Sequence, residues 1–362
     1  MKMSIVFLMV MFAAVLLSAG DYKVLLLGDI HFDAPRYHTS PDGKIKSRYS
    51  KPHSAMWANK QAHNFLSAAA KALDKEFPFV IQVGDFIEGY GATEAQRAEM
   101  MTDAFKTVKG FFPEHKLLAV KGNHDVRREM EKSVKGKIRK VAGWDHRTYV
   151  KNFLPLLAKE LGRKKLDSNF ILTHGKDLFI FYDGFANSAR SMAFLKKALE
   201  VNATARNVFF ITHLPVLACS TLDPAWLLPR YAQVAELLAQ RNAIIICAHT
   251  HQKSLIKAKF GKNTLTQVVV SSISHQWNNG KPLELLAGDK EAFYGKIPPR
   301  KAKTKGVAAL KKFLDSKELE IMNVYAFAFQ GFAVMKVQDN GGVALEIFNN
   351  DSGKPALVMQ LK

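Results

Sequence analysis

Five short apolar runs along the chain each end at a polar turn. They read KVLLL, FPFVIQV, KLLAV, NVFFI and AIIIC, and they stop just before Gly28, Gly84, Lys121, Thr212 and Ala248. Runs of this length with β-branched and aromatic residues are typical of buried parallel strands. In open α/β sheets, ligands bind at the carboxyl edge that such strands share. The pattern therefore predicts an α/β protein whose five loops meet at one point.

Helical and further strand patterns fill the stretches between these runs. We expect helices over residues 54–73, 93–109, 149–161, 188–200 and 307–319, and strands within residues 170–181 and 264–273. Near the C-terminus, two apolar segments at 332–337 and 343–349 flank Asn340-Gly341, which is a strong hairpin signal. Residues 355–361 favour one more strand.

The turns after the five runs carry side chains that can bind metal ions. They are Asp29 and His31 in GDIH, Asp85 in GDFIE, Asn123 in GNHD, His213 in THLP, and His249 and His251 in AHTH. A single Asp after a strand is usually a turn former or helix cap, and a lone His is more often packed than ligating. Five such blocks, each at a strand end, instead favour a shared site. Carboxylate, amide and imidazole donors suit Zn, Mn or Fe, and a set this large fits two divalent metal ions with one bridging carboxylate.

This order of motifs, DxH, GDxxE, GNHD, a His after a strand and HxH, resembles the calcineurin-like metallophosphoesterase superfamily across about residues 23–275. The resemblance implies a four-layer αββα sandwich of two mixed sheets with helices outside and a dimetal site at the strand carboxyl ends. It also implies that the C-terminal strands complete the second sheet. One metal would be held by Asp29, His31 and His251, and the other by Asn123, His213 and His249, with Asp85 bridging them.

The resemblance also assigns two residues that act without binding metal. His124 would face the leaving group as general acid, and Glu88 occupies the place where the family often has a carboxylate that orients this His. A hydroxide bridging the two metals would attack phosphorus, while the cations neutralise charge on the phosphate oxygens. Arg127 and Arg128, which follow GNHD, would either reach a substrate phosphate or begin a helix.

Two departures limit the match. Ala248 stands where the family usually has Gly, so this turn should avoid the Gly-only backbone region and be slightly more crowded. The purple acid phosphatase branch has Gly at the position of His31 and a metal-binding Tyr at that of Glu88, and neither is present. The motifs place the chain among DxH members, which resemble cyclic-nucleotide phosphodiesterases, sphingomyelinase-type phosphodiesterases and repair nucleases, and they do not choose among these.

The N-terminus has the pattern of a signal peptide. Lys2 precedes an almost unbroken apolar stretch from Ile5 to Leu17, and Ser18-Ala19-Gly20 supplies small residues for a signal peptidase. An uncleaved membrane anchor is the alternative. The first core strand starts at Lys23, which leaves almost no linker between a bilayer and the folded domain. We therefore expect cleavage, and a secreted or periplasmic protein.

Four segments organise the chain. They are a signal peptide at 1–20, a catalytic core at 21–275, a basic insertion or lid at 276–320, and C-terminal strands that complete the sandwich at 321–362. Cys219 and Cys247 follow strands that we expect to be neighbours, so the sequence allows either a disulfide or two buried thiols.

The chain carries a formal net charge of +20, from 52 basic and 32 acidic side chains. Such an excess predicts attraction to polyanions such as nucleic acid, phospholipid headgroups or phosphorylated glycans, unless it is only a solvated basic surface. No obligate protein partner is predicted. Two runs concentrate the charge, one at Lys135, Lys137, Arg139 and Lys140, and one at Lys296, Arg300, Lys301, Lys303, Lys305, Lys311 and Lys312.

Together these features predict an exported metal-dependent phosphoesterase that hydrolyses phosphate esters, with phosphodiesters favoured over monoesters. One alternative is a metal-dependent nuclease that grips nucleic acid through the basic runs and binds it in a salt-sensitive way. Another is a non-enzymatic polyanion-binding protein in which the metals are structural. The intact His124 argues against that last alternative, because a structural site needs no extra His that does not bind metal.

Overall fold

The computed structural model describes residues 20–47, 51–134, 137–218, 224–251, 253–270, 272, 305–314, 319–327, 331–349 and 353–362. The predicted signal peptide up to residue 19, most of the basic insertion and Cys219 lie outside these residues. The expected cleavage, the basic insertion or lid, and the choice between a disulfide and two buried thiols therefore stay predictions. Within the described residues, no helix is long and apolar enough to cross a membrane.

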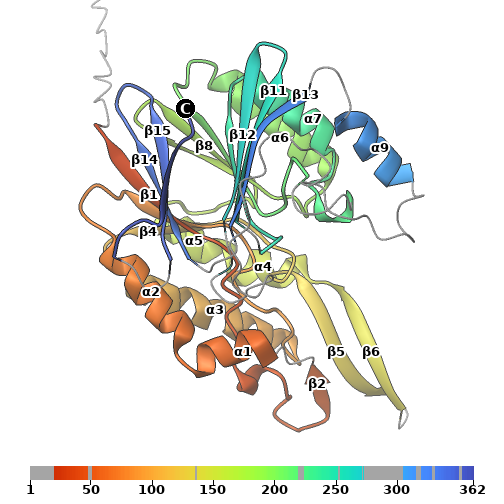
Figure 1. The fold of residues 1–362 in the computed structure, drawn as a ribbon. Helices are drawn as coiled ribbons and strands as arrows, with labels where there is room; N and C mark the ends of the chain where they lie inside the picture. The colour runs from red at the N-terminus through yellow and green to blue at the C-terminus, as the bar shows by residue number, and fades with distance from the viewer. Residues whose placement is uncertain are drawn as a thin grey trace, which may run out of the picture.

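Two mixed β-sheets face each other across a shared core (Figure 1). The first has the strand order β16-β15-β14-β1-β3-β4, and β1, β3 and β4 run parallel. Its strands are β1 Tyr22–Leu27, β3 Phe79–Gln82, β4 Lys116–Ala119, β14 Ala333–Val337, β15 Val343–Ile347 and β16 Leu357–Gln360. The predicted C-terminal hairpin is therefore confirmed as β14 and β15, and the strand after it is β16.

The second sheet has the strand order β13-β11-β12-β10-β9-β8-β7, in which β8, β9, β10 and β12 run parallel. Its strands are β7 Phe170–His174, β8 Asp177–Tyr182, β9 Val208–Thr212, β10 Ile244–Cys247, β11 Lys253–Phe260, β12 Asn263–Val269 and β13 Leu319–Phe327. The C-terminal strands are divided between the sheets, because β13 joins this one and the later strands extend the first. From the resemblance we expected the C-terminal strands to complete the second sheet, and of these strands β13 alone does so.

Successive residues of the central strands enter different cores. In β8, Phe179 and Phe181 belong to the core between the sheets, whereas Ile180 belongs to the core on the outer side. Strands β9 and β10 alternate in the same way. Because both faces of these strands are covered, their sequences are continuous apolar runs and lack an alternating polar pattern.

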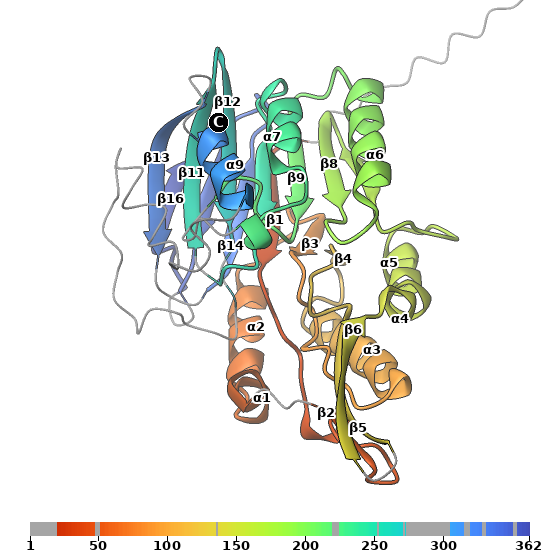
Figure 2. The same cartoon turned by 90° about the vertical axis from the view of Figure 1, so that its right-hand side faces the viewer.

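Helices cover the outer sides of both sheets, which confirms the predicted layered sandwich (Figures 1 and 2). On the side of the first sheet lie α1 Lys51–Ala58, α2 Gln61–Lys71 and α3 Glu94–Phe111, and on the side of the second lie α6 Ser188–Val201, α7 Tyr231–Ala239 and α9 Lys305–Leu314. The short helices α4 His146–Asn152 and α5 Leu154–Glu160 follow the region of β6. A 3-10 turn, η2, spans Pro224–Trp226.

Two of the predicted helices are each split in two. The segment 54–73 contains α1 and α2, which separate at Lys60, where φ is 61° and the backbone is left-handed. The segment 149–161 contains the end of α4 and all of α5. Pro155 stands in the first turn of α5, where its missing N–H leaves no hydrogen bond unmade.

A β-hairpin projects from the body of the protein as an arm (Figures 1 and 2). Its strands are β5 Arg127–Val134 and β6 Lys137–Trp144, and β2 Ile45–Ser47 pairs with β5. Arg127 and Arg128 thus begin a strand, so the expectation of a helix here is wrong. The root of this hairpin arm is closed by a hydrogen bond of 2.6 Å from the Asp145 N–H to the Val126 carbonyl.

The two basic runs are only partly described. Lys137, Arg139 and Lys140 lie on β6 of the hairpin arm, and Lys311 and Lys312 are exposed on α9. Lys135 and residues 296–304 of the second run lie outside the described residues. Helix α9 itself packs on the second sheet through Leu310, which belongs to the outer core.

Candidate functional site

The loops that follow five parallel strands bring all of the predicted metal-binding residues together. Strand β1 is followed by Asp29 and His31, β3 by Asp85, β4 by Asn123, β9 by His213, and β10 by His249 and His251. Side chains from distant parts of the sequence therefore share one edge of the two sheets. This placement is what the pattern of apolar runs and polar turns predicts.

Four of these residues hold a left-handed backbone conformation. The angle φ is 46° at His31, 53° at Asp85, 70° at His249 and 55° at His251. Such angles are uncommon outside glycine, and each costs on the order of 1–3 kcal/mol. Ala248 does not adopt a positive φ, as expected for a residue that replaces glycine. The strained turns direct the side chains of separate loops toward a common point.

One group of donor atoms comes from Asp29, His31, Asp85 and His251. Their ligand atoms all lie within 4.8 Å of one another. The Nε2 atoms of His31 and His251 are 3.3 Å apart, and His31 Nε2 lies 3.8 Å from Asp85 Oδ2. Nitrogen and oxygen donors this close can coordinate one ion.

A second group of donor atoms lies beside the first and shares Asp85 with it. Asp85, His213 and His249 also place their ligand atoms within 4.8 Å of one another. His213 Nε2 lies 3.3 Å from Asp85 Oδ2, 3.1 Å from Asn123 Oδ1 and 3.1 Å from His249 Nδ1. Asn123 therefore belongs to this group, and the Asp85 carboxylate lies between the two groups.

Burial and mutual charge set the protonation of these side chains. Burial lowers the pKa of His31 to about 3 and that of His249 to about 3, so both imidazoles are neutral and keep a lone pair. Burial raises the pKa of Asp29 to about 7. At His213, burial opposes the positive charge, but the neighbouring Asp85 carboxylate raises the pKa to about 9. In turn, His213 holds the pKa of Asp85 well below its usual range despite burial.

One buried oxygen indicates that the cluster is suited to a cation. Asp29 Oδ2 has no hydrogen-bond partner among the described residues, while Asp29 Oδ1 accepts from the His249 N–H at 3.3 Å. A buried carboxylate oxygen without a partner is unfavourable unless a positive charge neutralises it. Carboxylate, amide and imidazole donors are those of borderline divalent metals. The residues present therefore fit metal ions.

Hydrogen bonds behind the donor atoms fix their orientation. His213 Nδ1 donates to the Val83 carbonyl at 2.9 Å, which leaves Nε2 facing the cluster, where a bound cation would take the place of its proton. Asp125, the last residue of GNHD, accepts from the N–H groups of Phe86 and Ile87 at 2.8 and 3.1 Å and from that of Gly122 at 2.7 Å. This buried carboxylate, to which we gave no role from the sequence, joins the GNHD loop to the GD loop.

Glu88 contacts His124 in a different way from the one we expected. His124 Nδ1 lies 3.0 Å from the main-chain carbonyl of Glu88 and 3.7 Å from its carboxylate. The carboxylate instead lies 3.1 Å from His31 Nδ1 and 2.5 Å from His53 Nδ1. Burial opposes the charge of Glu88, but the hydrogen bonds to His31 and His53 hold its pKa well below its usual range.

His53 is a residue of the site that sequence reasoning missed. It lies on α1, its ring stacks on that of His31, and its donor atoms fall within 4.8 Å of those of His31 and His251. No strand end or motif marks it in the sequence KPHSAMW. Its place depends on how α1 packs against the loops, which only the fold defines.

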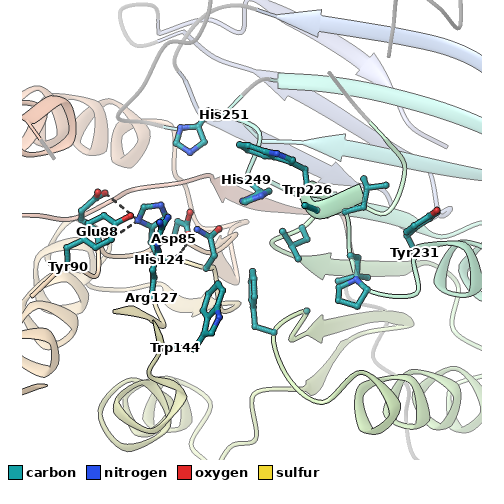
Figure 3. A pocket seen from close by; sticks show the side chains of 18 of the residues that line it. Asp85, Glu88, Tyr90, His124, Arg127, Trp144, Trp226, Tyr231, His249 and His251 are labelled. Atoms are coloured by element: carbon teal, nitrogen blue, oxygen red, sulfur yellow. Dashed lines mark hydrogen bonds and ion pairs between the residues drawn. The ribbon is translucent and has the colours of Figure 1, made fainter. Parts of the chain in front are cut away.

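A cavity of about 910 Å³ opens beside the cluster. In Figure 3, Glu88, Asp85 and His124 lie at one end of this cavity, and Trp226 and Tyr231 extend toward the other. The further lining residues include Trp144, Phe185, Leu214, Leu227 and Leu228. The polar cluster therefore continues into a largely apolar space.

The sequence of residues 22–253 matches the family described as calcineurin-like phosphoesterases. The match covers more than half of the chain and includes every residue that we predicted for the site, from Asp29 to His251. No curated protein matches the chain in sequence.

Several solved structures have a similar fold at 10–12% identity. A dimetal phosphatase from Danio rerio has a TM-score of 0.51 at 12% identity, over 94% of this chain and 99% of that one. GAP50, the anchor in the inner membrane complex of Plasmodium, has 0.51 at 10%, over 95% and 89%. The purple acid phosphatase PPD1 from yellow lupin seeds has 0.52 at 11%, over 94% and 53%, so this chain spans about half of the lupin protein. At such identities the likeness concerns the fold alone.

Proposed function

The chain belongs to the calcineurin-like phosphoesterase family, and on that premise we propose that it is a dinuclear, metal-dependent hydrolase of phosphoric esters. The observation that carries the proposal is the position of Asp85, whose carboxylate belongs to both groups of donor atoms. Two-metal hydrolytic sites use such a shared arrangement to hold two ions about 3.5–4 Å apart.

Each group of donors would hold one divalent ion, and Mn, Zn and Fe all suit them. Bound ions of this kind lower the pKa of a water molecule and neutralise charge on a phosphate group. Asn123 supports this function because a neutral amide donor adds no negative charge and leaves the site more attractive to phosphate. One ion would be held by Asp29, His31 and His251, and the other by Asn123, His213 and His249, with Asp85 between them.

His124 is the residue that we assign as proton donor to the leaving group. Its ring lines the cavity, and its Nδ1 lies 3.0 Å from the Glu88 carbonyl. When Nδ1 donates to that carbonyl, Nε2 remains to carry the proton that the departing oxygen needs. General acid catalysis of this kind typically contributes about 10²–10⁴-fold.

We also infer a preference for phosphodiesters over monoesters. A diester needs space for a second substituent beside the phosphate, and the cavity of about 910 Å³ supplies it. Among the described lining residues, the basic side chains other than histidine are Arg127 and Arg230. Fewer cations are needed for the single negative charge of a diester than for a monoester dianion.

Export remains part of the proposal. It is supported by the order of Lys2, the apolar stretch from Ile5 to Leu17, and the small residues before Asp21. We expect the protein to act outside the cytoplasm after cleavage, as a secreted or periplasmic enzyme.

Two alternatives have specific support. The hairpin arm carries part of a basic run and begins directly after the GNHD block, which would suit a nuclease that grips nucleic acid near the cluster. A non-enzymatic role is the other alternative, and its support is that the fold also occurs in GAP50, the anchor in the inner membrane complex of Plasmodium. The intact His124 and its open side toward the cavity favour the enzyme.

Hydrolysis of p-nitrophenyl phosphate and bis-p-nitrophenyl phosphate tests the proposal. The protein is stripped with a chelator and then supplied with manganese, zinc or iron. Activity that disappears with the chelator and returns with metal is the expected result, with a higher kcat/KM for the diester. A folded, metal-loaded protein that hydrolyses neither ester contradicts the proposal, and a preference for the monoester contradicts the diester assignment.

A further inference from the structure

The cavity beside the cluster has an apolar lobe that the chemistry of a phosphate group does not require. We define the apolar lobe by the side chains of Trp144, Phe185, Leu214, Trp226, Leu227 and Leu228. Together with the polar end, it forms a single cavity of about 910 Å³, within the range of sites that bind drug-sized ligands. Such a volume accommodates a substantial group attached to the phosphate.

The apolar lobe is continuous with the metal-binding residues. Leu214 directly follows His213 in the chain, and both lie in the loop after β9. The ring of Trp226 lies 4.8 Å from that of His249. Figure 3 shows Trp226 beside His249 and Trp144 on the other side of the opening. A phosphate held at the cluster would therefore place its ester substituent directly at the lobe.

Trp144 is the least buried part of this lobe. Its side chain is 59% exposed, and it is the one aromatic among the large exposed hydrophobic side chains of the described residues. It lies at the root of the hairpin arm and stacks on Phe185 with 6.0 Å between ring centroids. An exposed Trp beside a cavity with apolar walls is a surface that an apolar ligand would remove from water.

The lining chemistry favours an aliphatic group over a nucleobase. Among the described residues that line the cavity, the carboxylates, the amide and the imidazoles lie at its polar end. The side chains that define the apolar lobe carry no amide or hydroxyl, and their polar atoms are the indole N–H groups of Trp144 and Trp226. Arg230 and Tyr231 also line this cavity, but neither offers the amide that pairs with the edge of a base. Proteins that read a base in a pocket combine stacking with such hydrogen bonds, whereas an alkyl chain needs only apolar contact.

Building on the proposed function, we propose that the preferred substrates are phosphodiesters in which one substituent is a long-chain aliphatic alcohol. The phosphate binds at the cluster, and the chain lies in the apolar lobe against Trp144 and Leu228. Each buried methylene group strengthens binding to the lobe, so kcat/KM should rise with chain length as long as the chain fits.

The test uses a series of diesters that share p-nitrophenol as the leaving group and carry a methyl, butyl or octyl group as the second substituent. We expect kcat/KM of the metal-loaded protein to increase at least about tenfold from methyl to octyl, which is a cautious value for burial of several methylene groups. Trp144→Ala should lower the octyl-to-methyl ratio at least about threefold. Val201→Ala, which changes an exposed side chain on α6, should leave this ratio unchanged.

A binding measurement separates this inference from the proposed function. Methyl-, butyl- and octylphosphonate are titrated into the metal-loaded protein by calorimetry, with and without Trp144→Ala. Tighter binding of the octyl compound that depends on Trp144 supports the lobe even if no ester is hydrolysed. If esters are hydrolysed without regard to chain length, the inference is overturned and the hydrolase stands. A higher kcat/KM for thymidine p-nitrophenyl phosphate than for the octyl ester would also overturn it, in favour of a base-binding pocket.

Discussion

The ring of His53 lies flat on the ring of His31, with centroids 4.0 Å apart and planes inclined by 11°. Both imidazoles present Nδ1 to the same oxygen of Glu88, at 2.5 Å from His53 and 3.1 Å from His31. The Glu88 side chain is buried, so water hardly competes with the two rings for this oxygen. Helix α1, which carries His53, thereby holds in place a donor that we assign to the metal site.

This relationship predicts that His53 acts as a positioning residue through Glu88. His53→Ala should lower metal affinity or kcat/KM about 10–100-fold, the range found for residues that orient a metal ligand. Metal affinity is measured by titration of the stripped protein, and kcat/KM with a chromogenic diester. His115→Gln is the control, because His115 lies just before β4, at the opposite end of that strand from Asn123.

A double variant decides whether the effect passes through Glu88. Glu88→Gln and His53→Ala share one hydrogen bond, so their effects should not add. We expect the double variant to lose no more affinity than Glu88→Gln alone. Fully additive losses would mean that His53 contacts the substrate or a metal itself, and the positioning role would then be wrong.

The assignment of His124 as proton donor predicts a dependence on the leaving group. His124→Ala should lower turnover of a phenyl ester by about 10²–10⁴-fold, because phenol is a poor leaving group that needs a proton. The p-nitrophenyl ester should lose less, since its leaving group departs readily as an anion. Metal content, measured on the same preparations, should stay at the wild-type value. An equal loss for both esters would contradict the assignment.

The part of the site that lies at strand ends could be predicted because its signal is local. An apolar run followed by a polar turn fixes both a buried strand and the edge where its loop lies, and this is sufficient to bring Asp29, Asp85 and His213 together. The positions of the ligand atoms within the cluster could not be predicted from the sequence, because they depend on the backbone conformation of each loop. The left-handed turns at His249 and His251, for instance, have no marker in the sequence, because neither position is a glycine.

The parts that sequence did not reveal depend on contacts between distant segments. His53 reaches Glu88 across 35 positions of the chain, and no periodicity reports such a contact. Strand β11 has lysines among its apolar residues, so its sequence does not predict a buried strand. It nevertheless pairs with β12 on one side and with β13 on the other. The strands of the hairpin arm mix charged and apolar residues without a long apolar run, so the sequence pattern does not mark them and their pairing with each other defines them.

Removal of metal should destabilise the folded protein. Ions that bind only the native state stabilise it by RT ln(1 + [L]/Kd), which is about 2.7 kcal/mol at a concentration of 100 Kd. We expect chelation to lower the melting temperature by several degrees, and resupply of metal to restore it. Asp85→Asn should abolish most of this difference, because Asp85 belongs to both groups of donors. A melting temperature that is insensitive to chelation in wild-type protein would contradict a metal site.

The hairpin arm is held to the body by Asp145, which predicts a large loss of stability when this side chain is removed. Asp145 caps α4 by accepting from the Thr148 N–H at 3.1 Å, and it also forms an ion pair with Arg97, whose side chain is only 3% exposed. Asp145→Ala should therefore lower the free energy of unfolding by about 3 kcal/mol, from the lost cap and the unpaired buried cation. Urea denaturation at constant m-value measures this change.

Because Asp145 pairs with Arg97, the loss of unfolding free energy in Asp145→Ala should depend on pH. Burial opposes the charge of Asp145, but the hydrogen bonds from Thr148 and Arg97 lower its pKa below the ordinary 3.8. A carboxyl group whose pKa is lower in the folded state stabilises the protein fully above the unfolded-state pKa, and its contribution disappears as the pH falls through the folded-state pKa. The difference in unfolding free energy between wild type and Asp145→Ala should be constant near neutral pH and shrink in acid. Glu200→Ala, which removes an exposed carboxylate 3.4 Å from Lys197 on α6, should change stability by less than about 0.5 kcal/mol. If Asp145→Ala changes the free energy of unfolding as little as Glu200→Ala does, the arm does not depend on this contact.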